Sequence, residues 1–306
     1  TIFFYFSLKN FSKLNFQNFL IFLILCISNP ILFFDNIEAI DYSWAFLFFG
    51  IGLFFLSKRK REIAVLFFAF CIGSRINFVV FVLIAYLFID TDYKLKLFEK
   101  IYNFLIVFIL GGLFYLPVWF YSKFGLGWLT AARPLEQGFM GLLVRFIYKT
   151  HLTFGFFQFF LIFFILLSIF YRKKFISFFK KNNFLLILII SNFLIFLYIP
   201  AELSYLQPAI IFFYFLLVGN FNKKISYLLI CLNFLSWFVN INYLNIKHSE
   251  EGLCAPKKAI SASFELSIQE GYLSKYLNTR EMIKCWANEN DEVGQRIIQG
   301  KALRNK

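Results

Sequence analysis

The feature that most constrains this chain is a succession of apolar runs that are almost free of charged residues. These runs are rich in Phe, Leu and Ile, and they follow one another along most of the 306 residues. Several reach the roughly 20 residues that an α-helix needs to cross a bilayer. The runs cover residues 16–34, 43–57, 63–74, 76–90, 101–121, 153–171, 184–200, 205–220 and 224–243.

The composition argues against a water-soluble fold. Hydrophobic residues make up 60% of the chain and charged residues 16%, whereas soluble domains are typically about 45–50% apolar and about 25% charged. A chain of this size cannot hide so much apolar surface in one core. We therefore predict an all-α fold, in which residues 1–245 form a polytopic transmembrane helix bundle with nine crossings, two of them short.

The net charge of +14 lies mainly in the turns between the apolar runs. The turns form two alternating sets. One set holds sixteen basic residues in total, and the other set holds five. The positive-inside rule therefore places the first set of turns in the cytoplasm of a bacterial inner (plasma) membrane. Residues 35–42, 122–152 and 201–204, and the tail from about Lys247, then face outside. The expected partner is the lipid bilayer and not a nucleic acid, because no phosphate-binding groove is indicated.

Two of the runs, 63–74 and 76–90, are too short for full crossings and meet at Arg75. They form either an inward-returning pair of helices or one tilted helix. A single helix would move every later loop to the other side and place the basic turns outside. The charge pattern therefore favours the pair.

Residues 246–306 are expected to form a small, soluble, helical domain on the outer side of the membrane. Segments 261–277 and 279–303 are interpreted as its helices. Cys254 and Cys285 both lie in this tail. A disulfide between them is a hypothesis, because an outside compartment permits disulfides and the tail is too small for a large core.

Ionisable groups at the lip of a membrane are costly and indicate function by default. Asp35, Glu38 and Asp41 precede one apolar run and are suited to bind a divalent cation, Mg²⁺ or Mn²⁺, or to act as a base. A solvated turn is the alternative. Arg75 stays charged and needs an anion or water. It is suited to hold a lipid phosphate, or else it reaches toward lipid headgroups.

Two further clusters lie in the later outer loops. Arg133 and Arg145 belong to the long loop 122–152, where basic and aromatic residues suit a sugar-phosphate ligand. The alternative is an interfacial helix over 138–149. Glu202 and Tyr205 lie in a polar break with Pro on both sides, and Glu202 is suited to acid/base chemistry, metal binding or a sugar hydroxyl. A plain connecting turn is the alternative.

In their order along the chain, these features resemble the GT-C superfamily, the polytopic membrane glycosyltransferases that use polyprenyl-phosphate-linked sugars. The resemblance covers roughly residues 16–245, and a small outer C-terminal domain also fits the family. It is carried by Pro30 and Asp41 before a helix, the basic turn Lys58–Arg61, the short pair meeting at Gly73-Ser74-Arg75, and the stretch Pro200–Pro208, which is similar to the family's Tyr-Leu-x-Pro segment.

The resemblance implies transfer of a sugar from a polyprenyl-phosphate donor to an acceptor on the outer side. Asp41 would match the acidic group of the second outer loop, and Arg75 would lie near the donor phosphate. Glu202 and Tyr205 would lie at the sugar or metal site. The leaving phosphate would be stabilised by Arg75, or by Arg133 and Arg145.

The catalytic Asp or Glu that the family carries in its first outer loop has no counterpart here, so the catalytic residue is not assigned. Because the sequence opens at Thr1 without Met or a basic flank, we expect an N-terminally incomplete chain.

Three other functions are open. A polysaccharide polymerase or ligase acting on polyprenyl-linked sugars would rely on Arg133 and Arg145. A transporter would show internal repeats and charges near the middle of the membrane, and we find neither pattern in the sequence. A non-enzymatic membrane protein would use none of these groups.

Overall fold

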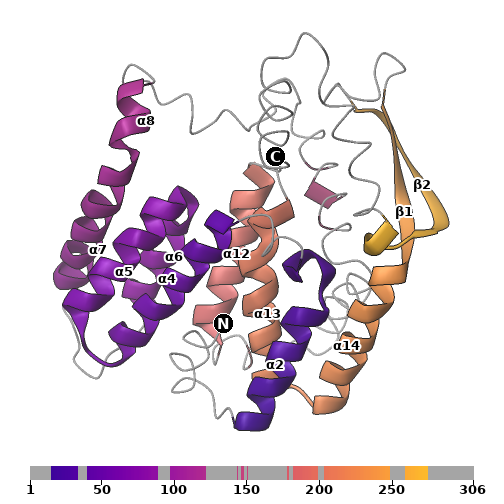
Figure 1. The fold of residues 1–306 in the computed structure, drawn as a ribbon, viewed down its shortest axis with the longest axis horizontal. Helices are drawn as coiled ribbons and strands as arrows, with labels where there is room; N and C mark the ends of the chain where they lie inside the picture. Colours follow the sequence, from indigo (N-terminus) through magenta and orange to yellow (C-terminus); the bar gives the residue numbers. More distant parts are fainter. Residues whose placement is uncertain are drawn as a thin grey trace, which may run out of the picture.

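The computed structural model describes residues 15–33, 40–88, 97–121, 143, 146–147, 150, 178, 182–198, 203–248 and 259–274. In these residues the protein is mostly α-helical, and its last two elements form an antiparallel sheet (Figure 1). The elements are α2 (Phe16–Ser28), α4 (Ile40–Ser57), α5 (Arg61–Ser74), η1 (Ile76–Phe78), α6 (Val79–Phe88), α7 (Leu97–Gly112), η2 (Leu113–Tyr115), α8 (Leu116–Tyr121), α12 (Asn183–Tyr198), η4 (Leu203–Leu206), α13 (Gln207–Asn220), α14 (Lys223–Phe238), β1 (Val239–His248) and β2 (Ala259–Glu270).

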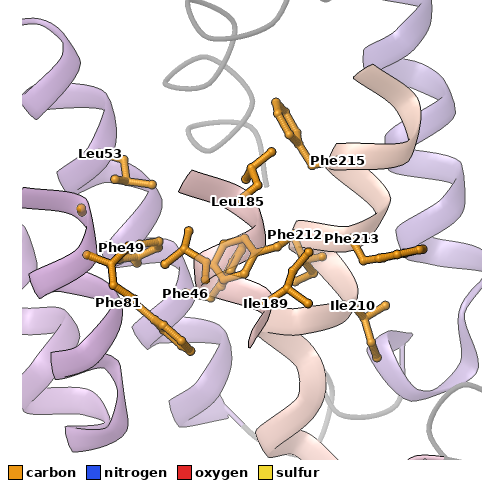
Figure 2. Packing of buried hydrophobic residues seen from close by; sticks show 14 of the residues in the cluster. Phe46, Phe49, Leu53, Phe81, Leu185, Ile189, Ile210, Phe212, Phe213 and Phe215 are labelled. Carbon is orange, nitrogen blue, oxygen red and sulfur yellow. The ribbon is translucent and has the colours of Figure 1, made fainter. Parts of the chain in front are cut away.

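Helix α13 is the centre of the bundle. Every residue from Gln207 to Val218 is buried. Figure 1 shows α4 to α8 on one side of α12 and α13, and α2 and α14 on the other side. In Figure 2, Phe212 of α13 points toward Phe46 and Phe49 of α4, and the ring centroids lie 5.7 Å and 6.1 Å apart. A helix that is buried all round needs no polar face, and from Pro208 to Val218 the sequence of α13 is apolar apart from the Tyr214 hydroxyl.

The contacts between side chains define the directions of the helices. Tyr42 pairs with Tyr205, and further along both segments Phe46 pairs with Phe212, so α4 and α13 run in the same direction. Asn182, just before α12, is hydrogen-bonded to Asn220 at the end of α13. Helix α12 is therefore antiparallel to α13.

Helices α2 and α14 run parallel to each other. Lys223 at the start of α14 is hydrogen-bonded to Gln17 at the start of α2. Trp237, near the end of α14, donates its indole N–H to the carbonyl oxygen of Ser28 at the end of α2, over 2.7 Å. Both helices therefore finish at the end of the bundle where α13 begins.

The two short helices α5 and α6 meet at Arg75, as predicted, and fold back on each other. Phe68 of α5 and Tyr86 of α6 have ring centroids 5.5 Å apart, whereas one straight helix would separate them by about 27 Å at 1.5 Å per residue. The carbonyl oxygen of Ile72, which loses its helical partner at the break, accepts a hydrogen bond from the Tyr115 hydroxyl over 2.9 Å. The returning pair is therefore confirmed.

The charged residues of the described helices and turns lie at the two ends of the bundle. Lys100 donates to the carbonyl oxygen of Leu87, which brings the start of α7 to the end of α6. By the helix directions above, this end also holds the α4–α5 turn and the start of α14. Its charged residues are Lys58, Arg59, Lys60, Arg61, Glu62, Glu99, Lys100, Lys223 and Lys224; within residues 15–238 as described, the opposite end has only Asp41 and Arg75.

One described helix, the continuous stretch Leu97–Phe120, is long and apolar enough to cross a membrane. It lies at the edge of the bundle and is mostly exposed, with Phe98 and Ile109 at 78% and 62% of full exposure. The five other apolar helical stretches are shorter: Phe16–Ser28, Tyr42–Ser57, Ile76–Phe88, Asn183–Tyr198 and Gln207–Asn220. The helical class of the bundle is confirmed, whereas the nine crossings stay a prediction. The run 153–171 lies outside the described residues.

The prediction of a wholly helical tail is wrong for the residues that the structure describes. Helix α14 ends at Phe238, inside the predicted run 224–243, and β1 follows directly. Strand β2 replaces the predicted helix from residue 261 to 270. Alternation of apolar and polar residues, as in Ile260-Ser-Ala-Ser-Phe264, favours a strand. The predicted boundary between residues 245 and 246 falls inside β1.

The hairpin is joined closely to the end of α14. The backbone N–H of Gly271 donates to the carbonyl oxygen of Phe238 over 2.9 Å. A Cβ atom on Gly271 would lie 2.5 Å from backbone atoms of Trp237 and Phe238, so only glycine fits. The hairpin therefore begins at the end of the bundle that carries Arg75. The segment 279–303 and both tail cysteines, Cys254 and Cys285, lie outside the described residues.

Adjacent glycines of α7 provide a test of the helix packing. A Cβ atom on Gly111 would lie 2.8 Å from Cβ of Ile72 and 3.1 Å from the carbonyl oxygen of Ala69, whereas one on Gly112 would meet nothing within 4 Å. We expect Gly111→Ala to lower the free energy of unfolding by about 1–3 kcal/mol through overpacking. Gly112→Ala should leave it unchanged or raise it slightly. Thermal unfolding in detergent measures both, and equal effects would contradict the α5–α7 packing.

Candidate functional site

Arg75 lies in the break between α5 and η1. Its backbone is extended, with φ −149° and ψ 115°, and the residue is partly buried. The guanidinium carbon lies 4.0 Å from the centroid of the Tyr42 ring. The ring face is attractive to a cation, and the side chain cannot lose its charge. The break thus holds a fixed positive charge against an aromatic ring.

Tyr42 connects Arg75 to the start of α13. Only 1% of Tyr42 is exposed, and its ring meets that of Tyr205 edge to face, with centroids 5.3 Å apart and an interplanar angle of 67°. Tyr205 belongs to the single turn η4, which precedes α13. The structure therefore brings together Arg75 and Tyr205, two residues that the sequence placed in the candidate site, through a third that it did not.

One buried amide, Asn192, contacts this aromatic pair, and two other amides, Gln207 and Asn77, have a buried polar atom. Asn192 of α12 donates its Nδ2 hydrogen to the carbonyl oxygen of Tyr205 over 3.0 Å. Its Oδ1 has no partner in the part of the chain that the structure describes, and the same is true of Nε2 of Gln207 and Nδ2 of Asn77. Burying such a group without a partner costs about 1–3 kcal/mol. Each of these atoms can still accept a hydrogen bond from, or donate one to, a polar ligand or water.

A second polar cluster joins α2, α13 and α14. The Tyr214 hydroxyl accepts a hydrogen bond from Nδ2 of Asn29 over 2.9 Å and lies 2.9 Å from Nδ2 of Asn233. Asn233 also bonds the Ser28 hydroxyl over 3.2 Å. Because these groups satisfy one another, the cluster fits a structural role of the kind that polar side chains have between membrane helices.

Of the other predicted site residues, the structure describes only the backbone of Asp41. Asp41 is the second residue of α4 and directly precedes Tyr42, but its side chain is not described. The remaining candidates lie outside the described residues: Asp35, Glu38, Arg133, Arg145 and Glu202. Within the described residues no three His, Cys, Asp or Glu side chains form a metal-binding group. The expected Mg²⁺ or Mn²⁺ ion stays a prediction.

Sequence reasoning did not single out Tyr42, Asn77 or Asn192. Tyr42 directly follows Asp41, and Asn77 lies two residues after Arg75, so both were close to predicted positions. Asn192 was recognisable only as an amide in the middle of an apolar run. Polar side chains of this kind also hydrogen-bond between packed membrane helices, and only the contact with Tyr205 associates Asn192 with the site.

No protein family matches this chain, and no curated protein or solved structure matches it either. The likeness to the GT-C superfamily therefore depends on the residues discussed above.

The contact between Arg75 and Tyr42 is testable by a double-mutant cycle. We expect Arg75→Met and Tyr42→Leu to show a coupling of about 0.5–2 kcal/mol, because each removes one partner of the cation–π pair. Unfolding in detergent, with urea as denaturant, measures the four free energies. In the control cycle Tyr42→Phe keeps the ring and should preserve the interaction. A coupling energy of zero would show that the pair contributes nothing.

Proposed function

We propose that this chain is a membrane glycosyltransferase that moves a sugar from a polyprenyl-phosphate donor to an acceptor on the outer side of a bacterial inner membrane. The observation that carries the proposal is the position of Arg75. It is the one basic residue at its end of the described bundle, held on Tyr42 and close to Tyr205.

The distribution of charge supports placement in a membrane. The charged residues of the described helices gather at two ends, as they do when the middle of a protein lies in hydrocarbon. Large apolar side chains are exposed on the outer surfaces of α2, α7, α12 and α14. A helix at the surface of a soluble protein would carry polar residues there. In this arrangement the basic end lies in the cytoplasm, and Arg75 and the hairpin lie outside.

The chemistry of the donor suits this position. The prenyl chain of the donor lies among lipid tails, so its phosphate lies at the membrane lip, at the level proposed for Arg75. A guanidinium group binds a phosphate through two parallel hydrogen bonds. It would hold the donor and stabilise the charge that grows on the phosphate as the sugar leaves.

The other roles follow the resemblance. Tyr205 would lie at the sugar, and Asp41, Asp35 and Glu202 would supply an acid, a base or ligands for a divalent cation. The residue that removes the proton from the acceptor hydroxyl is not assigned.

Lipid phosphate binding tests the role of Arg75. We expect purified protein in detergent to bind undecaprenyl phosphate, and Arg75→Ala to weaken binding at least tenfold, because a charged hydrogen-bond pair contributes about 1.5–3 kcal/mol. Arg59→Ala removes a basic side chain at the opposite end and is the matched control. Native mass spectrometry with titrated lipid measures the affinities. Equal losses in both variants would exclude a specific site at Arg75.

A transfer assay separates the proposal from a polymerase or ligase. With membranes that contain the protein and radiolabelled lipid-linked sugars, Asp41→Asn should abolish transfer, because Asp41 directly precedes Tyr42, whose ring contacts Arg75. Arg133→Ala should retain most of it. The reverse pattern would favour the polymerase or ligase, in which Arg133 and Arg145 carry the reaction.

A further inference from the structure

Asn192 contacts Tyr205, and Gln207 lies two residues after Tyr205 in the chain. Each of the two amides has one unsatisfied polar atom, and the two atoms are of opposite kind. Asn192 is fully buried and Gln207 is 3% exposed. Asn192 uses its Nδ2 on the carbonyl oxygen of Tyr205, which leaves the acceptor Oδ1. Gln207 leaves the donor Nε2. In the described part of the chain neither atom has a hydrogen-bond partner.

A donor and an acceptor together select the group that they bind. A phosphate or carboxylate oxygen would satisfy Gln207 but not the oxygen of Asn192, and an ammonium group would do the reverse. A hydroxyl group donates one hydrogen and accepts others, so it is a group that either amide can bind. The chemistry of the two amides therefore fits a ligand hydroxyl, or a water molecule in its place.

The two amides are connected to Arg75 through the contacts of Tyr205 and Tyr42. Tyr205, which accepts from Asn192 and lies two residues before Gln207, packs on Tyr42, and Tyr42 packs under Arg75. This end of the bundle therefore carries a positive charge and neutral hydroxyl-binding groups that are connected through Tyr42 and Tyr205. A lipid phosphate that carries a sugar has this combination of groups.

We propose that Asn192 and Gln207 form a hydroxyl-binding subsite for the sugar of the polyprenyl-phosphate donor. This inference rests on the proposed function and adds the residues that select the sugar. A site built to hydrogen-bond a hydroxyl discriminates against a ligand without it, since its own polar atoms are then left unpaired. Arg75 holds what all such donors share, and the amides recognise what differs between them.

The test compares a bare lipid phosphate with its sugar-bearing forms. Farnesyl phosphate is titrated beside farnesyl-phosphoryl glucose, galactose, mannose, N-acetylglucosamine and arabinose, with the purified chain of 306 residues in detergent. We expect at least one sugar lipid to bind more tightly than farnesyl phosphate. Gln207→Met and Asn192→Leu should reduce that advantage about tenfold and leave the affinity for farnesyl phosphate unchanged, whereas Arg75→Ala should weaken both.

Stability without ligand provides an independent readout. Replacing an unsatisfied buried amide by an apolar side chain of similar size removes a cost, so Gln207→Met should keep or raise the melting temperature. Asn233→Leu is the matched control, because Asn233 is a buried amide with hydrogen-bond partners. It should lower the melting temperature and leave the preference for the sugar lipid unchanged.

The outcomes distinguish this inference from the proposed function. If farnesyl phosphate binds through Arg75 but no sugar adds affinity, or if the variants keep the full advantage, the amides hold water and the inference is wrong while the phosphate site stands. A fall in melting temperature for Gln207→Met as large as that for Asn233→Leu would also overturn the inference. If the wild-type chain binds none of the lipids, both proposals fail.

Discussion

The packing of α13 is the interaction on which the rest of the described bundle depends. This helix is buried from Gln207 to Val218, and the other helices arrange themselves around it because each has an apolar face to cover. Phe212 contacts the rings of α4 and α6 on one side, while Phe215 meets Phe22 of α2 on the other at 5.7 Å. Since aromatic rings pack edge to face or tilted at 4.5–7 Å between centroids, the many phenylalanines interlock without polar contacts. The polar side chains of the described bundle then lie at helix ends or in small clusters between helices.

This confinement gives the two ends of the bundle different chemistry. One end collects the basic turns, which fit a cytoplasmic surface under the positive-inside rule. The other has Arg75 on Tyr42, with Tyr205, Asn192 and Gln207 close by. The polar groups between α2 and α14 are paired with one another, so they stabilise the bundle, whereas the amides beside Tyr205 are not. The contrast between satisfied and unsatisfied buried amides separates the structural cluster from the one proposed to bind a ligand.

Much of the bundle was predictable because its signals are local. Apolar runs bounded by charged or polar residues located the helices, and the basic turn Lys58–Arg61 placed the end of α4 within one residue. The returning pair at Arg75 followed from charge on alternate turns. The tail was predicted wrongly because helical periodicity was assumed over 261–277, while alternation in β2 and its pairing with β1 favour a hairpin, as in Ile241 opposite Ile268. Asn192 escaped notice because its meaning depends on Tyr205, which lies on another segment.

The sequence by itself determined that the described chain forms apolar helices with charged turns, and that Arg75 interrupts two of them, because these features depend on residues near one another in the chain. Only the tertiary structure decided that Arg75, Tyr42 and Tyr205 meet, and that Asn192 lies against the last of them. These contacts join four segments, and no local pattern encodes which faces of four apolar helices pack together. That choice depends on how the side chains of the whole bundle fill the space around α13.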